Sequence, residues 1–218
     1  MRILEEKLNK HIELLIKRYE VLQSIKEQIA NAYFILEDSF KNGGKLLIAG
    51  NGGSAADAEH ITGELMKSFK KKRKVSAEFA KKLIEIDSKG GEELAVKLQE
   101  GLPTIALSNH AALTTAYLND VDGLLCFAQQ VNGYGKNIDI FLGISTSGNS
   151  NNILYAAITA KAKGMKVIGL TGRDGGRLKD VSDVSIIVPE NETYIIQELH
   201  LPIYHCWCLM LEDRFFCN

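Results

Sequence analysis

The residues best suited to chemistry follow a short glycine-rich turn. A β-rich run, Lys45–Ala49, ends in the sequence Gly-Asn-Gly-Gly-Ser over Gly50–Ser54, where a helix is predicted to begin. His60 and Glu64 lie on that helix, four residues and therefore about 40° apart around its axis. An imidazole and a carboxylate on one helix face can transfer protons or bind a metal ion.

A second loop combines glycine with hydroxyl side chains. It follows a predicted strand, Ile138–Ile144, and leads into a helix predicted over Asn149–Lys163. Backbone N–H groups at a helix start are unpaired and lie at the positive end of the helix dipole. The hydroxyls that can add donors for phosphate oxygens are those of Ser145, Thr146, Ser147 and Ser150. An ordinary N-cap explains one hydroxyl but not four, and no Walker A sequence is present, so the loop predicts a monophosphate site.

Two further candidates lie on a helix predicted over Glu192–Phe216. Gln197 and His205 are eight residues apart, about 80° around an ideal helix, so they can loosely share a face. Together with His60 and Glu64 they offer nitrogen and oxygen donors for a zinc-like ion, or a base, an acid and an orienting group for proton transfer. Spacing alone leaves open whether the two helices meet.

Asn119 and Asp120 precede Val121–Gly123 in a predicted polar turn. Their amide and carboxylate can hydrogen-bond sugar hydroxyls, or they can simply end a helix. The residues themselves leave both interpretations open.

The elements that must position these groups alternate between strand and helix. The five predicted strands are Lys45–Ala49, Thr104–Leu107, Ile138–Ile144, Lys166–Thr171 and Ser185–Val188. Strands alternating with helices predict an α/β fold over residues 1–218, a three-layer sandwich whose mostly parallel five-stranded sheet has helices on both faces.

Two segments fall outside this alternation. Residues 1–41 carry an apolar stripe at helical spacing, which predicts a long amino-terminal helix, or two helices end to end, partly packed against another subunit. Residues 69–102 are charged and favour helix over Ser76–Ile86 and Glu92–Gln99, separated by Asp87–Gly91. We interpret this second segment as an inserted helical hairpin.

The composition of the chain argues against several classes of function. The 26 Lys and Arg residues balance 27 Asp and Glu residues, so the net charge of -1 gives no general attraction to nucleic acid or anionic membranes. The basic run Lys70–Lys74 is interpreted as a solvated loop. Four irregularly spaced cysteines do not form a disulfide framework, and Met1–Lys7 lacks the apolar stretch of a signal peptide, so we expect a cytoplasmic protein.

Four motifs in order resemble one known family. Gly50–His60, Gly143–Ser150, Leu170–Gly176 and Gln197–His205 together are similar to the phosphoheptose isomerases of the sugar isomerase (SIS) superfamily. The resemblance implies the SIS fold, a cytoplasmic homotetramer and conversion of sedoheptulose 7-phosphate to D-glycero-D-manno-heptose 7-phosphate.

The resemblance also implies roles for particular residues. Glu64 would be the base and His205 the acid of an isomerisation through an enediolate. The implied ligands of one zinc ion per subunit are His60, Glu64, Gln197 and His205. The implied substrate-binding residues are Asn51, Gly52, Gly53, Glu64, Asn119, Asp120, Ser145, Thr146, Ser147, Ser150 and Gln197.

Two departures from the family pattern leave the substrate open. They are the insertion at residues 69–102 and Tyr194, which stands where some members carry an acidic sugar-binding residue. Another ketose phosphate, including that of an arabinose-5-phosphate-type isomerase, is one alternative. A non-catalytic SIS module that binds sugar phosphates or regulates a partner is the other.

Overall fold

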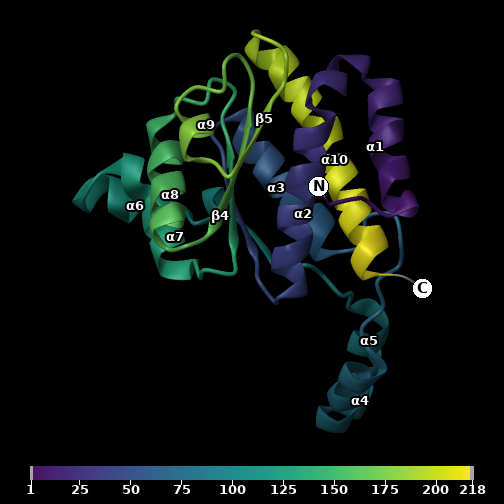
Figure 1. Ribbon diagram of the computed structural model, residues 1–218. Coiled ribbons are helices and arrows are strands. Elements are labelled where there is room, and N and C mark those ends of the chain that lie inside the picture. Colours follow the sequence, from purple (N-terminus) through teal and green to yellow (C-terminus); the bar gives the residue numbers. More distant parts are fainter. Residues whose placement is uncertain (1, 217–218) are drawn as a thin grey trace.

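A parallel sheet of five strands forms the centre of the computed structural model, which describes residues 2–216 (Figure 1). Its strands are β1 (Leu46–Ala49), β2 (Thr104–Ala106), β3 (Ile140–Ile144), β4 (Lys166–Thr171) and β5 (Val184–Ile187). Their order across the sheet is β2-β1-β3-β4-β5, and every neighbouring pair is parallel. The predicted α/β fold class is confirmed, and each observed strand lies within about two residues of its prediction.

The strands bury both of their faces, because alternate side chains enter two separate cores. Leu46 and Ile48 of β1 pack into one core, and Leu47 and Ala49 into the other. The first core is covered by α1 (Glu6–Arg18), α2 (Lys26–Lys41), α3 (Gly53–Met66) and α10 (Thr193–Phe215). The second is covered by α7 (Cys126–Tyr134), α8 (Asn151–Ala162) and α9 (Leu178–Val181), and α6 (Ala111–Asp120) packs outside α7.

The amino-terminal region does not form one long helix. The backbone of Tyr19 (φ -135°, ψ 74°) ends α1, and a 3₁₀ segment over Glu20–Ile25 leads into α2. The chain therefore turns, so that α1 packs on α10 while α2 lies against β5 and α10 (Figure 1). The apolar stripe is buried within the chain's own core. The stripe is thus explained without a second subunit, and the homotetramer stays a prediction.

The helix α10 spans 23 residues and contains Pro202, which cannot donate a backbone hydrogen bond within the helix. It remains one continuous helix and crosses the first core. The Trp207 indole Nε1–H donates to the carbonyl oxygen of Ile29 at 3.0 Å, which joins α10 to α2. This fixes the helix that carries Gln197 and His205.

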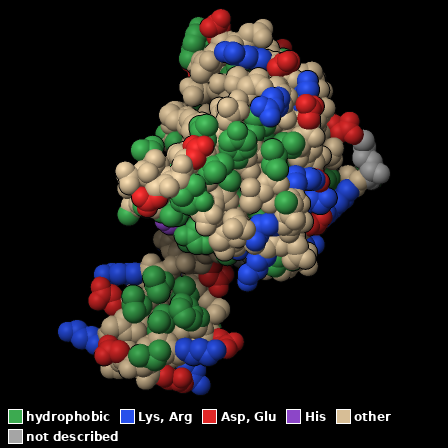
Figure 2. Space-filling model, turned by 90° about the vertical axis from the view of Figure 1, so that its left-hand side faces the viewer, with side chains coloured by type: hydrophobic (Ala, Val, Ile, Leu, Met, Phe, Trp, Pro, Cys, Tyr) green, Lys and Arg blue, Asp and Glu red, His purple; other side chains and the backbone are tan. Residues whose placement is uncertain are grey.

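Residues 77–97, within the predicted insertion at residues 69–102, form an arm that projects from the body (Figures 1 and 2). Its helices α4 (Ala77–Ile86) and α5 (Ser88–Lys97) pack chiefly on each other. The expected break over Asp87–Gly91 was wrong: α5 begins directly after Asp87, whose side chain accepts the Gly90 N–H. Gly91 lies at the contact between the two helices, where a Cβ would come within 2.2 Å of the Leu83 carbonyl oxygen.

Hydrophobic side chains gather on the face of this arm that Figure 2 shows. The exposed large ones are Phe79, Ile84, Ile86, Leu94, Val96 and Leu98. Elsewhere, Cys126, Cys206 and Cys208 are buried free thiols, and Cys217 lies outside the described residues. Within residues 2–216, no helix combines the length and apolar character needed to cross a membrane.

Candidate active site

The two predicted loops meet at one edge of the sheet. Ala49 at the end of β1 pairs with Gly143 near the end of β3, so Gly50–Ser54 and Ser145–Ser150 leave the sheet side by side. The strand order reverses direction between β1 and β3, which is where ligands bind in open α/β sheets. An open cavity of about 340 Å³ lies there. Its lining residues are Asn51, Gly52, Gly53, Ser54, Ile144, Ser145, Thr146, Ser150, Thr193 and Gln197.

The hydroxyl loop contributes three of its four predicted residues to this cavity. Ser145, Thr146 and Ser150 line it, and the Ser145 and Ser150 hydroxyl oxygens are 3.0 Å apart. Ser150 occupies the N-cap of α8 without a side-chain capping bond, so its hydroxyl is not consumed by the helix start. Ser147 instead accepts the backbone N–H of Asn149 at 3.2 Å, within the loop.

A glycine allows this loop to pack tightly on its neighbour. Gly148 has φ +65°, and a Cβ there would lie 1.9 Å from the carbonyl oxygen of Gly175. The Gly172 N–H donates to the Thr146 carbonyl oxygen at 3.1 Å. The glycine-rich segment Leu170–Gly176 therefore supports the hydroxyl loop from behind and does not line the cavity.

The opposite wall is built by the turn after β1. Asn51 and Asn152 exchange two amide hydrogen bonds, of 3.0 and 2.8 Å, which join this turn to the start of α8. Gly53 faces Gln197 so closely that a Cβ would lie 2.5 Å from the Gln197 Nε2 atom. Gln197 from α10 thus closes the cavity against the first turn of α3.

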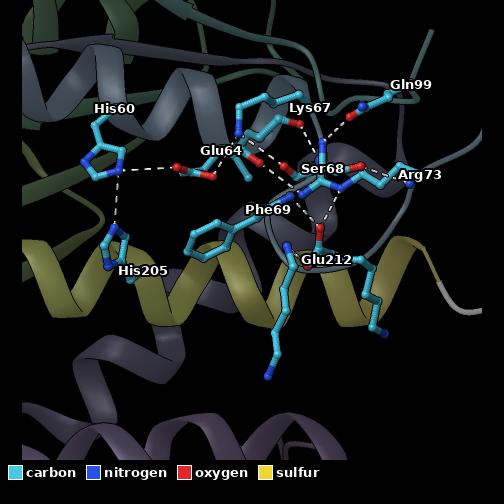
Figure 3. Close-up of polar contacts among 12 residues, drawn as sticks. His60, Glu64, Lys67, Ser68, Phe69, Arg73, Gln99, His205 and Glu212 are labelled. Carbon is cyan, nitrogen blue, oxygen red and sulfur yellow. Dashed lines mark hydrogen bonds and ion pairs between the residues drawn. The ribbon is translucent and has the colours of Figure 1, made fainter. Parts of the chain in front are cut away.

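Farther along the same two helices, three of the predicted chemical groups come together (Figure 3). The Nε2 atom of His60 lies 3.3 Å from Glu64 Oε1 and 3.4 Å from His205 Nε2. Glu64 is largely buried, its Oε2 atom accepts no hydrogen bond from residues 2–216, and the Lys67 ammonium lies 3.6 Å from it. The two helices therefore meet at this point, which residue spacing alone had left open.

Burial shifts the pKa values of two side chains in and beside this cluster. It lowers the pKa of His205, the nearby His60 lowers it further, and Glu64 partly opposes the change. A neutral imidazole has one N–H donor and one lone pair, so His205 is able to donate a hydrogen bond to an oxygen that becomes negative. Burial raises the pKa of Asp57, against the effects of the Tyr204 hydrogen bond and of His60.

Two residues beside the cluster lie within the predicted motifs Gly50–His60 and Gln197–His205 but were given no role from the sequence. The Tyr204 hydroxyl lies 3.0 Å from Asp57 Oδ1 and 3.1 Å from His60 Nδ1. Asp57 is one helical turn before His60, and Tyr204 directly precedes His205. Their place inside these motifs was the available sequence signal, but it did not reveal the contact itself, which joins residues 147 positions apart.

The segment after α3 is anchored by a buried ion pair, which corrects the interpretation of Lys70–Lys74 as a solvated loop at Arg73, whereas Lys70, Lys72 and Lys74 are exposed (Figure 3). Arg73 is 2% exposed, and its guanidinium donates to Glu212 Oε1 at 2.9 Å and to the carbonyl oxygens of Glu64 and Leu65. Arg73 therefore satisfies the carboxy-terminal end of α3.

Glu212 also accepts the backbone N–H groups of Phe69, Lys70 and Lys71. Together these contacts hold the Phe69 ring 5.5 Å, centroid to centroid, from the His205 ring. The end of α3 and the aromatic neighbour of His205 are thus positioned by one carboxylate of α10.

Three predicted groups are not brought to the cluster. Asn119 and Asp120 end α6, where the Asn119 amide donates to the Asp120 carboxylate at 2.8 Å, and neither residue lines the cavity. Gln197 lies at the cavity beside Gly53 and makes no hydrogen bond to His60 or His205 in the described residues. Binding of a sugar by Asn119 and Asp120 stays a prediction.

The cluster can be tested against the implied zinc ion. Ligand atoms about 2.0–2.1 Å from a tetrahedral zinc are about 3.3 Å apart, and the two measured separations at His60 Nε2 agree with that edge. The donor types also suit zinc, and the buried Oε2 of Glu64 has no hydrogen-bond donor among the described residues. Glu64 and His205 form no direct ion pair, and residues 2–216 contain no three His, Cys, Asp or Glu side chains already arranged around one metal position. The side chains of His60, Glu64 and His205 therefore suit zinc in chemical type and in two of the three distances between their ligand atoms.

Comparison with known proteins agrees with this architecture. The SIS domain family matches residues 10–89 and 92–172. A phosphoheptose isomerase from a Nitratiruptor species is 40% identical over 196 residues, covering 90% of this chain and 91% of that protein. One from Helicobacter hepaticus is 40% identical over 212 residues, covering 97% and 93%. The chain belongs to the phosphoheptose isomerase family.

Solved structures support this membership. A phosphoheptose isomerase from Francisella tularensis superposes with a TM-score of 0.74 at 33% identity, covering 95% of this chain and 97% of that one. The enzyme from Neisseria gonorrhoeae gives a TM-score of 0.72 at 31% identity, covering 95% and 98%. The resemblance stated from the four motifs is confirmed, and so is the expectation of an enzyme of the phosphosugar isomerase class.

Proposed function

We propose that this protein converts sedoheptulose 7-phosphate into D-glycero-D-manno-heptose 7-phosphate. The observation that carries the proposal is the cluster of His60, Glu64 and His205 on two helices whose first turns line a hydroxyl-rich cavity. The names of the related proteins support the same activity.

The separation between cavity and cluster supports a long substrate. The helix α3 rises about 10 Å from Gly53 to His60, and α10 rises about 12 Å from Gln197 to His205. A substrate whose phosphate lies in the hydroxyl loop must extend about that far to bring its carbonyl group to the histidines. A seven-carbon ketose with a terminal phosphate meets this requirement better than a short sugar does.

The cavity residues would bind the non-reacting part of the substrate. The hydroxyls of Ser145, Thr146 and Ser150 and the amino-terminal end of α8 would hold the phosphate. Asn51 and Gln197 would hydrogen-bond the sugar hydroxyls nearest to it. This arrangement fixes the substrate at one end, so that the other end is oriented at the cluster.

Glu64 and His205 would carry the proton transfers. Glu64 would remove a proton from C1 of the ketose while His205 donates a proton to the oxygen on C2, which forms an enediol. Return of the carbon-bound proton from Glu64 to C2, with loss of the proton on the C1 oxygen to His205, would give the aldose. The reaction needs no external oxidant, and each positioned transfer contributes about 10²- to 10⁴-fold.

We include one zinc ion per subunit in the proposal, held by His60, Glu64 and His205. When bound, such an ion would polarise the substrate's carbonyl and stabilise negative charge on its oxygen. The predicted cytoplasmic homotetramer belongs to the same proposal.

The decisive experiment measures aldose formation from sedoheptulose 7-phosphate with and without added zinc. Glu64→Gln is expected to lower turnover by about 10²- to 10⁴-fold while retaining affinity for the sugar phosphate. Glu59→Gln is the matched control, because Glu59 lies on the same helix with an exposed side chain that accepts a hydrogen bond from Ser108. It should leave turnover unchanged.

Substrates of other lengths test the alternatives. No aldose from sedoheptulose 7-phosphate in either condition would overturn the proposed reaction. Turnover of a five- or six-carbon ketose phosphate instead would reassign the substrate. Tight binding of every sugar phosphate without any turnover would support the non-catalytic SIS module.

A further inference from the structure

The Tyr204 hydroxyl occupies a position between a carboxylate and the inner ring nitrogen of His60. It lies 3.0 Å from Asp57 Oδ1 and 3.1 Å from His60 Nδ1, and Tyr204 is 1% exposed. The Tyr204 ring also packs edge-on against His60 and His205, with centroid separations of 5.5 and 5.1 Å. The hydroxyl is therefore held by packing as well as by its two polar contacts.

One proton on the phenol restricts how these contacts can be made. A tyrosine hydroxyl donates one hydrogen bond and can accept others, whereas an ionised carboxylate only accepts. When Tyr204 donates to Asp57, its oxygen lone pair can accept only from a protonated Nδ1 of His60. The reverse chain, from a protonated Asp57 through Tyr204 to an unprotonated Nδ1, is the competing arrangement.

We propose that Asp57 and Tyr204 are positioning residues that hold His60 as the Nδ1–H tautomer, so that its Nε2 lone pair faces Glu64 and His205. This tautomer presents a lone pair 3.3 Å from the Glu64 carboxylate and 3.4 Å from His205 Nε2. Two acceptors facing each other repel unless a cation or a donated proton lies between them. We call this chain of Asp57, Tyr204 and His60 the relay. By fixing the tautomer, it leaves the cluster ready to bind a cation.

The arrangement follows a general feature of metal sites. A ligating histidine usually donates its other ring N–H to a carboxylate, a carbonyl or water, which fixes the tautomer and the ring orientation. Here the phenol stands between the imidazole and the carboxylate. The inference rests on the proposed function only in taking His60 as part of the reacting cluster.

The first test observes the tautomer directly in the full chain. Ring-nitrogen ¹⁵N spectra of the zinc-free protein are expected to show His60 protonated at Nδ1 and unprotonated at Nε2, with His60→Gln used for assignment. Tyr204→Phe keeps the ring but removes the hydroxyl, and it should shift His60 toward the Nε2–H tautomer. A wild-type His60 protonated at Nε2 would overturn the inference.

The second test titrates each protein with Zn²⁺ against a chromophoric chelator. Tyr204→Phe is expected to weaken zinc binding by about 10- to 100-fold. Tyr155→Phe is the control, since Tyr155 is a partly exposed tyrosine of α8 outside the cavity and the cluster. Equal zinc affinities for wild type and Tyr204→Phe would also overturn the inference.

These readouts separate the inference from the proposed reaction. A wild-type protein with the expected tautomer and zinc affinity but no aldose product would contradict the reaction and leave the relay intact. An active enzyme whose His60 tautomer is unaffected by Tyr204→Phe would contradict the relay and leave the reaction intact.

Discussion

The stability of this protein is expected to depend on pH through one buried histidine. His200 on α10 has no exposed surface, and its Nε2–H donates to the Thr171 carbonyl oxygen at 3.1 Å. Its Nδ1 atom has no hydrogen-bond partner among the described residues. Protonation would place a charge and an unsatisfied N–H in the core, and burial accordingly lowers the pKa of His200 to about 4.

The magnitude follows from the difference between folded and unfolded pKa values. The unfolded pKa is 6.5, so between about pH 6.5 and pH 4 the unfolded chain binds more protons than the folded one. The contribution of His200 is therefore fully present above this window and is lost as the pH falls. At about 1.4 kcal/mol per pKa unit it amounts to about 3 kcal/mol in total, of which about 2 kcal/mol is lost between pH 7 and pH 5.

The assay compares wild type with His200→Gln, which offers an amide N–H to Thr171 but does not titrate. Urea unfolding followed by circular dichroism at pH 7, 6 and 5, at one protein concentration, gives the free energy of unfolding. Only the change with pH is compared, so a lower stability of the variant at pH 7 does not affect the result. Other titrating groups cancel in this comparison.

The wild type should lose about 2 kcal/mol more than His200→Gln between pH 7 and pH 5. Parallel curves for the two proteins would refute the reasoning, because they would mean that His200 is protonated in the folded state as readily as in the unfolded chain.

Three substitutions test packing contacts, two of them beside the site and one in the arm. Gly53→Ala should weaken sedoheptulose 7-phosphate binding by about tenfold or more, since its Cβ would lie 2.5 Å from Gln197 Nε2. A Cβ at Gly63 on the same helix meets nothing within 4 Å, so Gly63→Ala should bind the sugar phosphate as the wild type does. Arg73→Met should cost about 3–5 kcal/mol in urea unfolding because it leaves the Glu212 carboxylate buried without its cation, and a loss below 1 kcal/mol would contradict this. Gly91→Ala should separate α4 from α5 and speed amide exchange in the arm, because its Cβ would lie 2.2 Å from the Leu83 carbonyl oxygen. Gly90→Ala is the control, since its Cβ meets only the movable Asp87 side chain. Equal exchange in both variants would argue against the clash.

Local patterns were enough to predict the sheet and its loops. Short β-rich runs that alternate with helical stretches require parallel strands, and the strand order β2-β1-β3-β4-β5 then brings the Gly50–Ser54 and Ser145–Ser150 loops to one edge. The contact between His60 and Glu64 was equally predictable, because four residues on one helix span about one turn.

Predictions failed or stayed open where the outcome depended on distant partners. Residues 1–41 were predicted to form one long helix or two helices end to end. The structure has two, because Tyr19 ends α1, and α1 then packs on α10 while α2 packs on β5 and α10. Arg73 stands in a basic run typical of solvated loops, yet a carboxylate 139 residues away holds it in the core. Gly91 belongs to a helix because α4 packs against it closely.

The sequence by itself determined the alternation of strands and helices, the two loops at the strand ends, the spacing of His60 and Glu64, and a family resemblance specific enough to name. These follow from neighbours along the chain, whose geometry is set by the backbone. Only the tertiary structure decided that His205 meets His60, that Gln197 closes the cavity beside Gly53, and that Tyr204 joins Asp57 to His60. Those contacts cross about 145 residues of chain, and the packing of α10 against α3, which periodicity does not encode, brings them together.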